Sequence, residues 1–156
     1  MSLREKILEC STSYSDSLRE IRDPKGSSDS SYTVSNLTEQ EYSLIKFDSC
    51  VFDKTVEKCD FGLRSNDAMH YIELKGIKNN KGLSQLLTTI SATEQVYEDI
   101  QKKVRLIVSR EKAPRYLDQN TIRKIAVKVG SPLNDISENF IIRTTLKNYS
   151  LLKLTI

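Results

Sequence analysis

The sequence predicts an α/β (α+β) domain in which a mixed central β-sheet is flanked by helices. Three observations support this fold class. Apolar runs separated by turn residues fill positions 45–74, as is typical of short strands. Apolar residues recur at helical spacing over 82–101. A further apolar run follows at 104–109, so the central order is strand, strand, strand, helix, strand.

At the N-terminal end, a helix is expected over residues 2–22, because Ser2 and Glu5 form a capping-box pattern. The sequence Asp-Pro-Lys-Gly at 23–26 ends that helix. The serine-rich segment 26–36 is polar throughout and is expected to form a loop.

Thr38 and Glu41 repeat the capping-box spacing, which predicts a short second helix. Strands are then expected over 45–52 and 56–63, joined as a hairpin by a tight turn at 53–55.

A third strand is expected over 69–74, followed by the helix over 82–101 and the buried strand over 104–109. Asp118 is a suitable N-cap for a helix reaching about Ile125. Gly130-Ser131-Pro132 stops that helix. The runs 139–145 and 149–155 then resemble a last hairpin with its turn at Lys147-Asn148.

The composition is that of one globular domain spanning 1–156, with 38% hydrophobic and 29% charged residues. No apolar run approaches the roughly 18 residues that cross a bilayer. The N-terminus lacks the basic-then-apolar pattern of a secretory signal. The sequence therefore predicts a cytoplasmic protein without a membrane-spanning segment.

The net charge of +3 is unevenly distributed. Residues 1–45 contain 5 Lys+Arg and 8 Asp+Glu, a balance of −3, which leaves 19 and 13, a balance of +6, for residues 46–156. A basic excess suits a polyanionic partner. Charge alone favours the simpler explanation, a solvated surface of mixed sign.

The three cysteines are Cys10, Cys50 and Cys59, and they include no Cys-x-x-Cys pair. With a single histidine in the chain, a Cys/His zinc site is not expected. The odd count and the missing secretory signal predict reduced thiols. In a hairpin with its turn at Lys54-Thr55, Cys50 would lie opposite Cys59 as a small apolar neighbour.

The candidate site combines Asp60, in the run KCDFGL (58–63), with Glu73 and Lys75, in the run HYIELKG (70–76). Side chains at positions i and i+2 of a strand share a face, so Glu73 and Lys75 project together. Two carboxylates and an ammonium group can bind a hard divalent cation and position a water beside it. The alternative is a strand of alternating charge whose polar side chains only face water.

Asp60 and Glu73 are the predicted metal ligands, because Mg²⁺, or Mn²⁺ in its place, prefers oxygen ligands and keeps several waters. Lys75 is suited to orient or deprotonate an attacking water, or to neutralise charge on a phosphate. Gln85 lies one turn into the following helix, with Lys81 on the same helical face. Either side chain is a candidate to contact the metal-bound water or the phosphate, although an exposed polar face is the favoured explanation for each residue alone.

These runs, together with Gln85-Leu86 and Thr88-Thr89-Ile90, resemble the PD-(D/E)XK nuclease-like (restriction-endonuclease-like) superfamily. The resemblance covers about residues 38–110 and implies an αβββαβ core there. The N-terminal helix and serine-rich loop (1–36) would precede that core, and an extension (111–156) with a helix and a β-hairpin would follow it.

The resemblance also implies roles for the site residues. Asp60 and Glu73 would bind Mg²⁺, Lys75 would serve the attacking water and Gln85 would assist. Cys59 stands where proline is common in the superfamily. The glutamate that many members carry on the first helix has no unique match here. The candidates for this glutamate are Glu41, Glu9 and Glu20. Glu41 is also explained as a capping-box residue.

Three other features are better explained by structure than by catalysis. His70, the only histidine, is expected on the strand face opposite Glu73, which indicates a strand residue rather than a base. Tyr71 shares the Glu73 face, where core packing is favoured over stacking on a base. Basic residues after the strand at 104–109 are candidates for backbone phosphate contacts or for a solvated loop; they are Arg110, Lys112 and Arg115.

The sequence therefore predicts Mg²⁺-dependent hydrolysis of a nucleic-acid phosphodiester by a DNA endonuclease. A homodimer of this enzyme would allow both strands of a duplex to be cut. One alternative is a catalytically inactive module of the same fold that binds DNA or protein. Another is a toxin or immunity partner built on this scaffold.

Overall fold

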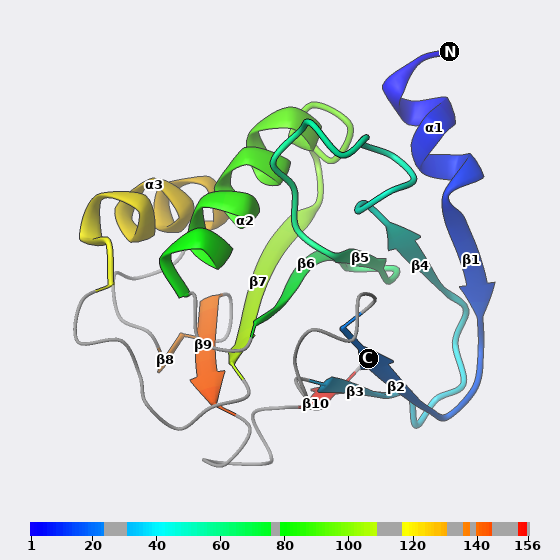
Figure 1. Cartoon of the computed structure of the whole chain (residues 1–156). Helices are drawn as coiled ribbons and strands as arrows, with labels where there is room; N and C mark the ends of the chain where they lie inside the picture. The colour runs from blue at the N-terminus through cyan, green and yellow to red at the C-terminus, as the bar shows by residue number, and fades with distance from the viewer. Residues whose placement is uncertain are drawn as a thin grey trace.

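The computed structural model confirms the predicted fold class, with helices packed on a mixed β-sheet (Figure 1). None of the described helices is long and apolar enough to cross a membrane. The structure describes residues 1–23, 31–75, 79–108, 117–130, 136–137, 140–144 and 153–155.

Among these residues, the larger sheet has the strand order β1-β4-β5-β6-β7-β9-β8. Neighbouring strands from β1 to β6 pair antiparallel, β6 to β7 and β7 to β9 pair parallel, and β8 pairs antiparallel with β9. The strands are β1 (Ser11–Tyr14), β4 (Tyr42–Lys46), β5 (Phe61–Arg64), β6 (Ala68–Lys75), β7 (Gln101–Val108), β8 (Ile136–Ser137) and β9 (Phe140–Thr144).

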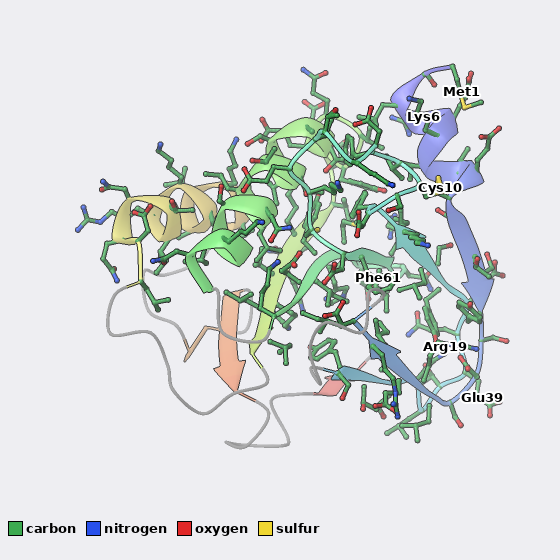
Figure 2. All side chains as sticks on the ribbon, viewed as in Figure 1. Met1, Lys6, Cys10, Arg19, Glu39 and Phe61 are labelled. Carbon is green, nitrogen blue, oxygen red and sulfur yellow. A yellow bond between two sulfur atoms is a disulfide. The ribbon has the colours of Figure 1, made fainter. Side chains whose placement is uncertain are left out.

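A smaller sheet packs against one face of the larger one (Figure 1). In it β3 lies between an antiparallel β2 and a parallel β10. Its strands are β2 (Leu18–Arg22), β3 (Ser31–Ser35) and β10 (Lys153–Thr155). Ile21, Tyr32 and Val34 from this sheet join Leu63 and Ile72 of the larger sheet in one buried cluster. Figure 2 shows Phe61, which packs against that cluster, near the centre of the molecule.

The helices cover the opposite face of the larger sheet. They are α1 (Leu3–Glu9), α2 (Asn79–Thr93) and α3 (Gln119–Val129). A second buried cluster joins Leu86 of α2 and Ile125 of α3 to Tyr71 and Leu106 of the sheet. The molecule therefore has three layers, and β6 runs through the middle layer with both faces covered.

Burial on both faces explains the composition of β6, in which every residue from Ala68 to Leu74 is buried. His70 is 3% exposed and shares a face with Ile72, so it points away from Glu73, as expected for a strand residue. Burial, with smaller contributions from the charges of Arg105 and Lys103, lowers the pKa of His70 to about 3. His70 is therefore a neutral core residue.

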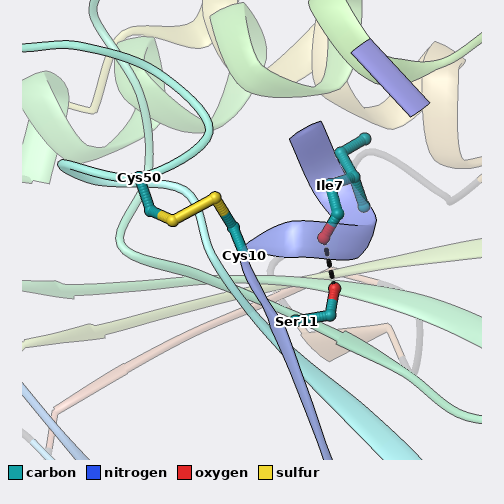
Figure 3. The surroundings of a disulfide bond; sticks show 4 residues. All are labelled: Ile7, Cys10, Ser11 and Cys50. Atoms are coloured by element: carbon teal, nitrogen blue, oxygen red, sulfur yellow. Dashed lines mark hydrogen bonds between the residues drawn. A yellow bond between two sulfur atoms is a disulfide. The ribbon is translucent and has the colours of Figure 1, made fainter. Parts of the chain in front are cut away.

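The predicted helix over 2–22 is wrong beyond Glu9. The capping box of Ser2 and Glu5 is present, but the helix ends after two turns and β1 and β2 follow. The segment 11–17 consists of Ser, Thr, Tyr and Asp, whose polar side chains compete for backbone hydrogen bonds and disfavour helix interiors. Ser11 does so directly, because its hydroxyl donates to the Ile7 carbonyl (Figure 3).

The two following predictions are also corrected. Residues 31–35 of the expected loop form β3, while 24–30 lie outside the described residues. The short helix at Thr38 is absent from this described segment. The Asn36 side chain instead closes a turn by donating to the Gln40 carbonyl (2.7 Å) and accepting from the Gln40 N–H (3.2 Å).

The hairpin predicted over 45–52 and 56–63 is confirmed only where these strands overlap β4 and β5, and its connection is wrong. β4 and β5 do pair antiparallel, but a long segment, residues 47–60, joins them in place of a tight turn. Its Phe47 and Val51 are both buried in the helix-side core, which draws the chain away from the sheet. Cys50 therefore does not lie opposite Cys59.

The second half of the chain follows the predictions more closely. The helix predicted over 82–101 ends at Thr93, and β7 begins at Gln101. Asp118 caps α3 as expected, and Gly130 ends that helix with φ 66°. The predicted C-terminal hairpin is wrong, because β9 and β10 belong to different sheets. The turn expected at 147–148 lies outside the described residues.

The prediction of reduced thiols is wrong for two of the cysteines. Cys10 and Cys50 form a disulfide across 40 residues of sequence (Figure 3). The segment 47–60 leaves the sheet beside the end of α1, where the Lys46 N–H donates to the Cys10 carbonyl (2.9 Å). Cys59 is a buried thiol outside this bond.

We predict that Cys10→Ser lowers the free energy of unfolding by about 3–4 kcal/mol, because the disulfide closes a long loop in the unfolded chain. Urea unfolding with and without dithiothreitol measures the effect. The parent should lose the same stability on reduction, and the variant should not respond to the reductant. A parent whose midpoint is unchanged by reduction would contradict the prediction.

Candidate functional site

Asp60 and Glu73 are brought together by the pairing of β5 with β6. The register places Phe61 opposite Ile72, so Asp60, directly before β5, lies opposite Glu73. The Asp60 N–H donates to Glu73 Oε2 (3.0 Å), and the Leu74 N–H donates to Asp60 Oδ2 (2.9 Å). These reciprocal hydrogen bonds fix both carboxyl groups at one end of the strand pair.

Lys75 completes the group of three residues predicted from the sequence. Its Nζ lies 3.3 Å from Glu73 Oε1, and the side chain is 19% exposed whereas that of Glu73 is 1% exposed. Glu73 thus receives a backbone N–H on one oxygen and an ammonium group on the other. The ammonium group lies between the buried carboxyl and solvent.

Burial makes this pair of acids unusual. It raises the pKa of Asp60 to about 6, with smaller contributions from Asp23 and Asp48, while the Leu74 N–H and Lys75 act in the opposite direction. Burial, followed by the charge of Asp60, raises the pKa of Glu73 well above its usual value. Two carboxyl groups that resist ionisation side by side form an environment that favours a cation.

The three residues open into a cavity of about 410 Å³. Its wall is largely charged and comes from β6, the start of α2 and the segment 47–60. The lining residues are Asp23, Asp48, Lys54, Thr55, Val56, Glu57, Lys58, Asp60, Glu73, Leu74, Lys75, Lys81 and Gln85.

Asp48 and Lys58 are parts of this cavity that the sequence did not reveal. Lys58 Nζ lies 3.5 Å from Asp48 Oδ1 and donates to the Asp53 carbonyl (2.9 Å). The Asp48 N–H lies 3.4 Å from the Asp60 carbonyl. Ser49 has φ 63° and separates Asp48 from the disulfide-bonded Cys50. Because Asp48 fell inside a predicted strand, no sequence pattern marked it.

Gln85 lies at the cavity, where its amide supports the backbone of the site. Gln85 Nε2 donates to the Lys58 carbonyl (3.0 Å), while its Oε1 is buried and has no partner among the described residues. One turn later, Thr89 Oγ1 accepts from the Cys59 N–H (2.8 Å). α2 therefore holds the chain directly before Asp60. Lys81 is exposed on the rim of the cavity.

The other residues singled out in the sequence lie elsewhere. The Tyr71 hydroxyl is buried against Thr93 Oγ1 (2.6 Å), which confirms its core role. The sequence offered three candidates for an additional acid, Glu9, Glu20 and Glu41. None of them lines the cavity, whereas Asp23 does. The basic residues Arg110, Lys112 and Arg115 lie outside the described residues.

A divalent cation at this site would have few protein ligands and would keep most of its waters. Within the described ranges, no group of three or more His, Cys, Asp or Glu side chains could hold a metal ion. Asp60 and Glu73 supply two carboxylates, a number that suits Mg²⁺ because this ion commonly takes one or two carboxylates and several waters.

No model of a known protein family matches this chain, and neither curated proteins nor solved structures give a significant match. The chemistry of the site therefore has to be argued from its own geometry.

We predict that Asp60→Asn stabilises the metal-free protein at pH 7, by on the order of 3 kcal/mol from a rise of about two pKa units. Folding raises the pKa of Asp60 from 3.8 to about 6, so the folded state binds this proton more tightly than the unfolded chain. The resulting destabilisation is absent below about pH 4 and complete above about pH 6.

Urea unfolding of both proteins between pH 4 and 7 measures this difference, with EDTA present. Asp67→Asn is the matched control, since Asp67 is exposed on a turn away from the cavity. The stability gain of Asp60→Asn should vanish towards pH 4. A variant less stable than the parent at pH 7 would contradict the prediction.

Proposed function

We propose that this protein is a Mg²⁺-dependent phosphodiesterase that hydrolyses nucleic acid, acting as a DNA endonuclease. The observation that carries the proposal is the convergence of Asp60, Glu73 and Lys75 on one charged cavity. Two adjacent carboxylates favour a divalent cation, which relieves their mutual repulsion. An ammonium group beside them suits a reaction in which negative charge develops on a phosphate.

Asp60 and Glu73 would hold the cation, and Mg²⁺ when bound supplies a water of lowered pKa and neutralises phosphate charge. Lys75 contributes an ammonium group that reaches from Glu73 towards solvent, where it can orient the water or contact the phosphate. Gln85 fixes the Lys58 carbonyl and so positions the chain entering Asp60. It is a positioning residue in this scheme.

The fold and the charge of the cavity support the proposal. β4, β5, β6, α2 and β7 follow one another in the order of the βββαβ part of the PD-(D/E)XK core, although β1, β2 and β3 separate them from α1. Lysine side chains at the cavity would attract a phosphate backbone; they are Lys54, Lys58, Lys75 and Lys81.

One observation favours a second candidate, a nuclease-fold module without catalysis that binds DNA or protein. The ammonium group of Lys75 and the Asp60 N–H already satisfy both oxygens of Glu73 without a metal. Such a module would show nucleic-acid or protein binding that does not depend on Mg²⁺.

Location and oligomeric state belong to the proposal as well. A homodimer would allow both strands of a duplex to be cut. A cytoplasmic location suits an intracellular nucleic-acid substrate, whereas the Cys10–Cys50 disulfide favours an oxidising compartment. Alkylation of accessible thiols in intact cells distinguishes the two, because only reduced Cys10 and Cys50 would be modified.

We predict that Glu73→Gln lowers Mg²⁺-dependent cleavage of plasmid and oligonucleotide DNA by about 100-fold or more, because it removes a ligand charge while retaining the side-chain shape. Cleavage assays with Mg²⁺, with Mn²⁺ and with EDTA measure the effect. Circular dichroism should show an intact fold.

Asp67→Asn again provides the control, with the same loss of one charge outside the cavity. Equal cleavage by the parent and Glu73→Gln would sink the assignment of this residue. A parent that binds DNA equally with and without Mg²⁺ and never cuts it would favour the non-catalytic module.

A further inference from the structure

A second cavity lies at the other end of β5 from the candidate site. It measures about 520 Å³ and is enclosed by α1, β4, the end of β5 and the segment 95–100, which leads from α2 to β7. Asp60 directly precedes β5 whereas Arg64 ends it, and the two cavities have no lining residue in common. This second cavity is therefore a separate feature of the molecule.

Two arginines line the second cavity, and neither guanidinium group is paired with a described residue. Arg4 comes from α1 and Arg64 from β5, and the side chain of neither makes an ion pair or hydrogen bond with another described residue. The charges of both lower the pKa of Tyr97, against the larger effect of burial. Two positive charges that line one cavity repel each other less when an anion lies between them.

Tyr97 supplies a third group that lacks a partner. The residue is 7% exposed, lines the same cavity, and its hydroxyl makes no hydrogen bond with any described residue. A buried hydroxyl left unpaired destabilises a fold, so such groups are rare unless another molecule pairs with them. Burial raises the pKa of Tyr97 to about 12, so the hydroxyl keeps its proton and can donate.

We propose that this second cavity binds a small ligand through one phosphate or carboxylate group, held by Arg4 and Arg64 and reached by the hydroxyl of Tyr97. Guanidinium groups match the paired oxygens of both anions and bind them with two parallel hydrogen bonds. The proposal is independent of the nuclease assignment, because it uses none of the residues of the first cavity.

The remaining wall defines what else the ligand must carry. Ile7 and Ile45 are buried and give the cavity an apolar floor, which suits an apolar ligand body. Glu98 and Asp99 are exposed and add negative charge to the lining. They would repel a polyanion, so the cavity fits a ligand with a single anionic group rather than a nucleic-acid strand.

The test is a ¹H–¹⁵N NMR titration of the full chain with inorganic phosphate and, separately, with acetate, at an ionic strength held constant with chloride. We expect saturable shifts at Arg64 and at residues 95–100 with at least one anion, and the tighter anion identifies the ligand class. Tyr97→Phe removes only the hydroxyl and should weaken that binding about tenfold, the value of a hydrogen bond to a charged group.

Arg64→Gln should abolish saturation, and Arg4→Gln is the alternative should that variant fail to fold. Arg123→Gln is the matched control, because Arg123 is exposed on α3 away from the cavity. The proposal is overturned if neither anion gives saturable shifts, or if Tyr97→Phe binds as tightly as the parent. Shifts at Arg64 that saturate with a DNA oligonucleotide but with neither anion would also overturn it.

Discussion

The structure around the candidate site depends on two reciprocal hydrogen bonds, from the Asp60 N–H to Glu73 and from the Leu74 N–H to Asp60. Each carboxyl group accepts a hydrogen bond from a backbone N–H at the end of the opposite strand. The bonds therefore link the start of β5 to the end of β6 and hold two acids together under a layer of helices. Without them, burial of both acids would favour separation of the strand ends, because a buried carboxyl group without partners is costly.

The surrounding segments support this arrangement. Gln85 and Thr89 of α2 bind the backbone just before Asp60, and the segment 47–60 closes the cavity with Asp48 and Lys58. The disulfide ties that same segment to the end of α1. The molecule thus keeps two acids with raised pKa values in place at a cost in stability, which is characteristic of functional sites.

Sequence patterns predicted those parts of the fold that depend on local periodicity. The strand around Glu73, the helix around Gln85 and the cap at Asp118 were all expected, and so was the adjacency of Asp60, Glu73 and Lys75. The long segment 47–60 was missed because Phe47 and Val51 look like strand residues, although both pack under the helices. Because this segment was missed, the Cys10–Cys50 disulfide and the position of Asp48 at the cavity were not predicted either. The cavity beside Tyr97 depends on contacts between α1, β5 and the end of α2, which no local pattern encodes.

The most direct test of the central claim is a crystal structure of the parent grown with Mn²⁺, with anomalous diffraction recorded near the manganese absorption edge. If Asp60 and Glu73 form a divalent-cation site, an anomalous peak will lie in contact with both carboxyl groups and will be missing in Glu73→Gln. A map of the parent at saturating Mn²⁺ with no peak there, and with Lys75 still bound to Glu73, would contradict the account.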